Sequence, residues 1–181
     1  MDDKQQIWEH YHYRFGLAGE GQADIIQTYL DCDPGRVLDI GCGPWGKCAR
    51  NLALHSGIFI AAAKSLGAGL LIDDPANIRL LMTDARCLCL ADESIDHIVA
   101  LGLFAEVPEI ETAQVFAEFY RVCRVSGELI LTNSVRLRRE FYCELGRRQG
   151  FHLLEEHEGY WPAVTGDIKG RYLLVFVKKL H

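Results

Sequence analysis

The feature that most constrains the fold is the stretch Arg36-Val-Leu-Asp-Ile-Gly-Cys-Gly-Pro-Trp-Gly-Lys47. Residues 37–40 form an apolar, β-branched run, which is typical of a strand buried on both faces of a sheet. Glycines follow at once, and residues 47–56 then carry apolar side chains at helical spacing. A strand, a glycine turn and a helix bring bare backbone N–H groups to a nucleotide-like ligand. Tight turns also need glycine for steric reasons, so a turn without a ligand remains an alternative.

Apolar runs and helical patterns alternate along the rest of the chain. Because alternation of strands and helices implies a parallel sheet covered on both faces, we expect an α/β fold. No helical pattern separates the last two strands, so they are expected to pair antiparallel. The expected architecture is a Rossmann-like three-layer sandwich with a mostly parallel seven-stranded sheet that ends in an antiparallel hairpin. Strands are predicted at 37–40, 57–61, 78–82, 95–101, 128–132, 152–156 and 172–177, and helices at 24–30, 47–56, 64–72, 112–124 and 138–149.

Length and composition indicate one compact domain. The 181 residues are enough for a full core. We expect residues 1–35 to form an N-terminal helical cap and residues 36–181 to form the ligand-binding domain. The net charge of −6 argues against a nucleic-acid partner, which needs clustered Lys and Arg. No apolar run reaches the 18 or so residues of a membrane span, and the polar, aromatic start is not typical of a secretory signal.

The seven cysteines do not indicate disulfides or a metal site. Their number is odd, and most lie within apolar patterns. Cys87 and Cys89 are too close together for the usual paired zinc spacing and have no second ligand pair at a suitable distance. We therefore expect a reduced, cytoplasmic protein without a metal.

Several motifs, in their order along the chain, resemble those of a known family. Asp39-x-Gly41-x-Gly43 resembles motif I of the class I S-adenosylmethionine (SAM)-dependent methyltransferases. Residues 84–96 look like the passage from strand three to strand four in the UbiE-like, or type 11, methyltransferases, in which an Asp opens strand four. Residues 116–131 are similar to the helix-to-strand signature of that family, in which Glu118 and Arg121 would form a pair.

The resemblance implies a cofactor site for S-adenosyl-L-methionine. In that family the backbone around the glycine turn approaches the amino-acid tail of the cofactor, and the acid before the turn holds its ammonium group. The Asp after strand three accepts the adenine amino proton. An Asp that orders the turn, and an Asp that merely closes a strand, remain alternatives for these two carboxylates. The implied residues are Asp39, Gly41, Cys42 and Gly43 at the tail, Asp84 and Ala85 at the adenine, and Leu101, Gly102 and Leu103 in the floor.

Two positions depart from the family pattern. An acidic residue usually ends strand two and takes both ribose hydroxyls, but here Ala63 stands at that place and Lys64 follows. A lost hydrogen bond to a charged group costs about 1.5–3 kcal/mol, which weakens binding roughly tenfold to a hundredfold. The third glycine of the motif is replaced by Trp45, which either caps the tail pocket or fills part of the cofactor space.

The predicted function is methyl transfer from SAM to a small-molecule acceptor. Such a transfer is an in-line displacement that depends mainly on proximity and orientation, and a base is needed only if the acceptor must lose a proton. The sequence carries no catalytic motif, so the catalytic residues are unknown. The alternative is a catalytically silent protein of the same fold that acts as a binding or partner subunit, and the aromatic cap is also compatible with a homodimer contact. Candidates near the mouth are Glu106, His157 and Trp161, with Tyr11 and Tyr13 as a lid.

Overall fold

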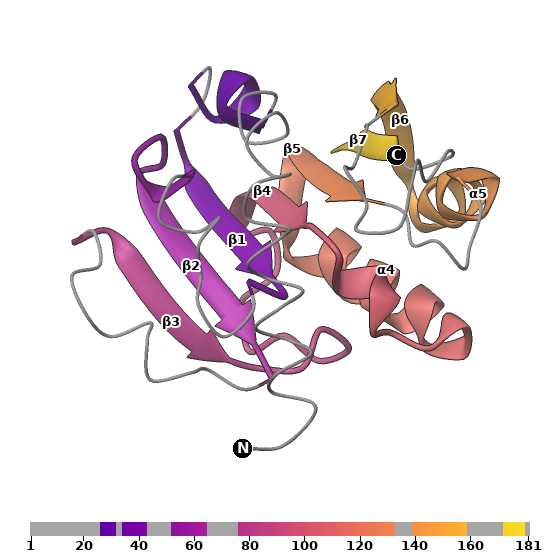
Figure 1. Cartoon of the computed structure of the whole chain (residues 1–181), viewed down its shortest axis with the longest axis horizontal. Coiled ribbons are helices and arrows are strands. Elements are labelled where there is room, and N and C mark those ends of the chain that lie inside the picture. The colour runs from indigo at the N-terminus through magenta and orange to yellow at the C-terminus, as the bar shows by residue number, and fades with distance from the viewer. Residues whose placement is uncertain are drawn as a thin grey trace, which may run out of the picture.

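The protein is an α/β sandwich built on one seven-stranded sheet with the order β3-β2-β1-β4-β5-β7-β6 (Figure 1). The computed structural model describes residues 26–31, 34–42, 52–64, 76–132, 139–158 and 172–179. Strands β1 to β5 run parallel, whereas β7 pairs antiparallel with both β5 and β6. The predicted fold class is therefore confirmed, including the antiparallel end of the sheet. The strands are β1 (Arg36–Ile40), β2 (Ile58–Ala63), β3 (Ile78–Met82), β4 (Ile95–Ala100), β5 (Cys123–Thr132), β6 (Phe151–Glu158) and β7 (Tyr172–Lys178).

Alternate residues of the strands supply one apolar core on each face of the sheet. One core contains Leu38, and the helices α4 (Glu109–Val122) and α5 (Arg139–Gln149) cover it. Its aromatic centre packs Phe104 against Phe116 and Tyr142, with ring centroids 5.6 and 5.1 Å apart. The other core contains Val37. This alternation explains why the parallel strands read as continuous apolar runs.

The second core reaches back into the region predicted as an N-terminal cap. A helical segment at 26–31 places Ile26 and Leu30 fully inside this core, beside Val37 and Phe59. Residues 1–25 lie outside the described part of the chain. The division into a cap and a binding domain therefore stays a prediction.

The main difference from the predicted elements lies at the start of β5. We expected a turn at 126–127 that leads into a strand, but β5 already begins at Cys123, which pairs with Ile95. The register shifts before His97 pairs with Glu128, and Ser126 has a φ of 64°. Ser126 and Gly127 therefore lie in an irregularity within a longer strand, because extra residues on one strand locally interrupt the ladder.

The other boundaries move by a few residues at most. The predicted helix 112–124 begins at Glu109 and ends at Val122. The predicted helix 138–149 is confirmed as α5, and Gly150 follows it with a φ of 99°. Of the predicted helix 47–56, the described part is helical at residues 52–53 and turns at 54–55. Nearly all of the predicted helix 64–72 falls outside the described residues.

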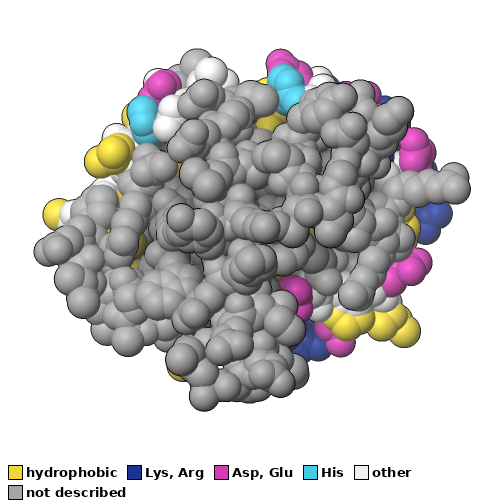
Figure 2. All heavy atoms as spheres, viewed as in Figure 1, with side chains coloured by type: hydrophobic (Ala, Val, Ile, Leu, Met, Phe, Trp, Pro, Cys, Tyr) yellow, Lys and Arg dark blue, Asp and Glu magenta, His cyan; other side chains and the backbone are white. Residues whose placement is uncertain are grey.

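The side chains around the start of α4 are mixed in character. The first turn of this helix carries acidic residues on both sides of Ile110, whose side chain is 90% exposed. Figure 2 shows hydrophobic, acidic and basic side chains of the described residues close together at the lower right of the view, near the outer end of α4. Among the described residues, no helix has the length and apolar character needed to cross a membrane.

Candidate cofactor-binding site

The sheet topology has its switch point between the carboxyl ends of β1 and β4. These two strands are parallel neighbours, but the chain first runs outward from β1 through β2 to β3 and only then enters β4. In open α/β sheets, ligands bind outside the carboxyl ends of the strands at such a switch point. The residues that directly follow β1 and β4 are Gly41 and Leu101, as the sequence analysis required.

The glycine turn after β1 packs closely against the loop after β4. Gly41 has a φ of 84°, and its N–H donates to the carbonyl oxygen of Ala62 at 2.8 Å. A Cβ atom at Gly41 would lie 3.2 Å from a methyl carbon of Leu103. Both the backbone conformation and the tight space favour glycine here. On the β4 side, Gly102 has a φ of 72°, and its N–H donates to the hydroxyl of Thr132 at 2.9 Å.

Asp39, at the end of β1, is a buried carboxyl group that lacks a full set of partners. Asp39 is 3% exposed, and its Oδ2 atom has no hydrogen-bond partner among the described residues. Burial raises the pKa of Asp39 from 3.8 to about 7. Buried polar atoms are usually satisfied, so an orphaned carboxylate oxygen beside a glycine turn indicates a place for a donor from a ligand. A cation suits it best.

Cys42, which follows this turn, is not a reactive thiol. Its residue is 8% exposed, and burial raises the pKa of the thiol far above its ordinary value, with the nearby Asp39 carboxylate adding to the effect. The thiolate is the nucleophilic form of cysteine, so this side chain stays protonated and acts as a small apolar wall.

Asp84, after β3, is held by a clamp that the sequence did not reveal. Its Oδ1 accepts from the Arg86 backbone N–H and from Arg86 Nε, both at 2.9 Å. Its Oδ2 accepts from Arg86 Nη2 at 2.6 Å and lies 3.2 Å from Lys64 Nζ. The hydrogen bonds from Arg86 hold the pKa of Asp84 well below its usual range. Arg86 is braced in turn by Glu111, with 2.9 Å between Nη1 and Oε1.

The four donors fill the lone-pair positions of the Asp84 carboxylate. An adenine amino group would therefore have to replace one of them. Lys64 is the donor that is most weakly held, because its side chain is 67% exposed and contacts Asp84 through Nζ alone, whereas Arg86 contacts Asp84 through several groups. Ala85, the residue expected to face the ring through its N–H, is buried at 5% exposure.

The end of β2 carries no carboxylate, in agreement with the departure noted in the sequence. Ala63 is the last residue of β2 and pairs with Met82 of β3. Its carbonyl oxygen accepts from the Thr83 N–H at 3.0 Å, which joins the two strand ends. Lys64 follows, and its ammonium group lies at the corner between the two strands.

The Glu118–Arg121 pair predicted from the resemblance is present and holds the loop after β3. Arg121 Nε lies 2.8 Å from Glu118 Oε1. The same guanidinium donates to the carbonyl oxygens of Leu88 and Leu90, both at 2.8 Å, and Glu118 accepts from the Leu88 N–H at 2.7 Å. Asp96 in turn accepts from the Arg36 N–H at 2.6 Å. The contacts of Glu118 and Arg121 fix the loop that carries Asp84, whereas the contact of Asp96 joins the starts of β4 and β1.

The remaining candidates are only partly placed by the structure. Glu106 is exposed just after the short helix Leu103–Ala105. His157 lies near the end of β6, with its Nε2 3.2 Å from Glu155. Gly43, Trp45, Trp161, Tyr11 and Tyr13 all lie outside the described residues.

The comparison with known families decides the class of the protein. Residues 37–127, which are half of the chain, match the sequence profile of a family described as a methyltransferase domain. The chain belongs to the class I SAM-dependent methyltransferases. S-adenosyl-L-methionine is the cofactor of this family, and the orphaned Asp39 carboxyl beside the Gly41 turn fits its ammonium tail.

The chain is also similar to individual proteins. It is 31% identical over 137 residues to a phosphatidylethanolamine N-methyltransferase from Cereibacter sphaeroides, a match that covers 70% of this chain and 64% of that protein. The chain thus spans less than two thirds of the length of that relative.

Solved structures share the fold of this chain at low identity. The 1,6-didemethyltoxoflavin-N1-methyltransferase of Burkholderia thailandensis, with bound 1,6-didemethyltoxoflavin and S-adenosylhomocysteine, aligns with a TM-score of 0.75 at 14% identity, over 98% of this chain and 83% of that one. A TehB-like SAM-dependent methyltransferase of Corynebacterium glutamicum aligns with a TM-score of 0.73 at 21% identity, over 97% of this chain and all of that one.

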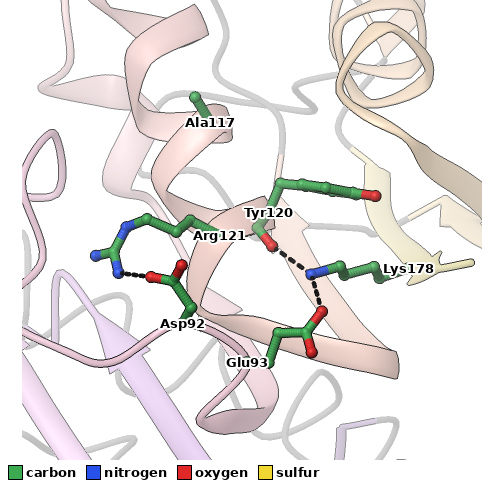
Figure 3. Close-up of a pocket in the computed structure, with 6 residues that line it drawn as sticks. All are labelled: Asp92, Glu93, Ala117, Tyr120, Arg121 and Lys178. Carbon is green, nitrogen blue, oxygen red and sulfur yellow. Dashed lines mark hydrogen bonds and ion pairs between the residues drawn. The ribbon is translucent and has the colours of Figure 1, made fainter. Parts of the chain in front are cut away.

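A cavity of about 500 Å³ lies at the opposite edge of the sheet from the glycine turn. Lys178 Nζ donates there to Glu93 Oε1 at 3.1 Å and to the carbonyl oxygen of Tyr120 at 2.9 Å (Figure 3). It also donates to the carbonyl oxygen of Cys123 at 2.8 Å. Arg121 pairs with Asp92 at 2.6 Å in the same view. The charged groups of this cavity thus pair with one another or with backbone carbonyl oxygens, and none of them lies at the carboxyl edge of the sheet.

Proposed function

We propose that this chain is an active methyltransferase that transfers the methyl group of SAM to a small-molecule acceptor by in-line displacement. The observation that carries the proposal is the Asp39 carboxyl, which is 3% exposed and has an Oδ2 atom without a partner among the described residues. Keeping a buried polar atom unsatisfied costs about 1–3 kcal/mol. A ligand donor that meets this oxygen would remove that cost, which supports a bound cofactor at this place.

In this proposal the chain binds the two ends of the cofactor through separate strands. Asp39 and the backbone around Gly41 hold the amino-acid tail, together with Cys42, Gly43 and Trp45. Asp84 and Ala85 hold the adenine, and Leu101 and Gly102 form the floor. Ala63 and Lys64 lie at the sugar. SAM supplies the methyl group from a sulfonium centre, so these residues need only position it.

In this proposal Asp39 also loses a proton when the tail of the cofactor binds beside its Oδ2 atom. Burial keeps much of this group protonated near neutral pH, because its pKa is about 7. An ammonium group beside Oδ2 favours the ionised carboxylate, so the proton leaves to solvent as the tail binds. The resulting charge-assisted hydrogen bond fixes the tail in a site from which water is largely excluded.

The acceptor in this proposal is a small molecule, and a phospholipid amine is the second candidate. The relative from Cereibacter sphaeroides is a phosphatidylethanolamine N-methyltransferase. Two exposed apolar side chains also lie on elements at the carboxyl edge, namely Met82 at the end of β3 (71% exposed) and Ile110 at the start of α4 (90% exposed). Apolar side chains beside the mouth of a site suit a lipid acceptor. We further propose that the protein is cytoplasmic and that its N-terminal cap can form a homodimer contact.

Methyl transfer from radiolabelled SAM tests both acceptors. The purified chain is incubated with a panel of soluble amines, phenols and heteroaromatic compounds, and separately with vesicles of phosphatidylethanolamine or of phosphatidylcholine. Label on a soluble compound supports the main proposal, and label on phosphatidylethanolamine vesicles alone supports the second candidate. If S-adenosylhomocysteine does not bind the chain at all, both are wrong.

A further inference from the structure

The corner between the ends of β2 and β3 has one carboxylate fewer than the family pattern implies, and two cations line it. That pattern has two carboxylates there, one for the ribose diol and one for the adenine. In this chain Ala63 replaces the first, and the two cations Lys64 and Arg86 contact the second, Asp84. Glu111 lies behind Arg86, on the side of α4. At the end of β2 the corner therefore presents a donor, Lys64, where the family pattern has an acceptor.

Lys64 is the only one of these groups that can change partner at little cost. Arg86 contacts Asp84 through its backbone N–H, Nε and Nη2 and also contacts Glu111, so it is held in four ways. Lys64 is 67% exposed and lies 3.2 Å from Asp84 Oδ2. An exposed ion pair of this kind contributes little to stability, and the flexible stem of lysine allows its ammonium group to move.

We propose that Lys64 is a specificity-determining residue of the nucleoside site, which recognises the sugar with a donor instead of a carboxylate. When the adenine amino group donates to Asp84 Oδ2, the ammonium of Lys64 leaves that oxygen and donates to the sugar oxygens. Hydroxyl groups accept hydrogen bonds as well as donate them, so an ammonium group can replace the missing acid. This inference rests on the proposed function, because it assumes that the cleft binds the adenosine part of SAM.

A lysine in place of a carboxylate at the end of β2 changes which ligands the site favours. An acid at the end of β2 would repel an anionic group on the sugar, whereas a lysine attracts it. The site should therefore bind an adenosine whose 3′-hydroxyl carries a phosphate more tightly than adenosine itself. One charge-assisted hydrogen bond corresponds to a factor of about ten, and salt should reduce this factor because Lys64 is exposed.

The test is competition against bound S-adenosylhomocysteine at low salt. Adenosine and adenosine 3′-monophosphate are titrated into the native chain, into Lys64→Met and into Lys179→Met. The last is the matched control, because Lys179 is an exposed lysine that follows β7 at the opposite edge of the sheet. We expect the phosphorylated ligand to compete about tenfold better in the native chain and in Lys179→Met, and about equally well in Lys64→Met. Ala63→Asp should reverse the preference in favour of adenosine.

Three outcomes would overturn the inference. The first is a preference for adenosine in the native chain, and the second is a preference for the phosphate that survives in Lys64→Met. The third is a lack of competition by both ligands while S-adenosylhomocysteine still binds. The unfolding midpoint of each variant is measured alongside, and it should not change in Lys64→Met because the side chain is two-thirds exposed. If S-adenosylhomocysteine does not bind the native chain, the proposed function itself fails.

Discussion

Replacing Asp39 by Asn should stabilise the free protein at alkaline pH. Burial raises the pKa of Asp39 from 3.8 to about 7 in the folded chain. Between these two values the folded state holds a proton that the unfolded state has lost, so the free energy of unfolding falls as the pH rises through this window. A difference of about three pH units corresponds to an upper bound of about 4 kcal/mol. Above about pH 7 the loss is complete. Because Asn cannot ionise, the Asp39→Asn variant does not lose this stability.

The measurement is urea unfolding of the native chain and of Asp39→Asn at pH 5 and pH 8. The stability of the variant relative to the native chain should rise by up to about 3 kcal/mol between these conditions, since about two pH units of the window remain above pH 5. Comparing the two pH values cancels any effect of Asn on packing. Asp96→Asn is the control, because Asp96 contacts Arg124 Nε at 2.6 Å, and this change should destabilise the protein at pH 8. A relative stability of Asp39→Asn that is the same at both pH values would refute the reasoning.

Three further predictions concern the turn and the loops around it. Gly41→Ala should lower the free energy of unfolding by about 1–3 kcal/mol, because its φ is 84° and a Cβ atom would lie 3.2 Å from Leu103; an unchanged urea midpoint would contradict this. Thr132→Val should weaken S-adenosylhomocysteine binding about fivefold in calorimetry, because the Gly102 N–H loses its acceptor at 2.9 Å; full affinity would show that the β4 loop needs no such anchor. Arg121→Met should lower the free energy of unfolding by about 1–3 kcal/mol, because Glu118 loses its partner at 2.8 Å; a variant as stable as the native chain in urea would exclude that role.

Much of the fold could be predicted because the local patterns and the topology agree. Strands alternated with helices up to Gln149, and the absence of a helical pattern between β6 and β7 indicated their antiparallel pairing. The predicted start of β5 was wrong because the pair Ser126-Gly127 is typical of a turn. The structure uses them as an irregularity between two paired segments of one strand. Sequence alone cannot separate these cases, since both need a residue with positive φ.

The site was less predictable than the fold. The resemblance pointed to Asp39, Asp84 and the Glu118–Arg121 pair, and the structure places the first two at the carboxyl edge. The orphaned state of Asp39 depends on burial, and the clamp of Arg86 on Asp84 depends on which rotamers meet across a turn. A spacing of two residues between an Asp and an Arg is too common to signal such a clamp.

Calorimetric titration of S-adenosylhomocysteine into the native chain and into Asp39→Asn at pH 8 tests the central claim most directly. We expect micromolar affinity for the native chain and a loss of about tenfold or more in the variant, since a charge-assisted hydrogen bond is removed. Absence of heat at millimolar ligand, or equal affinity in the two proteins, would contradict the assignment of the cleft beside Gly41 as the cofactor site.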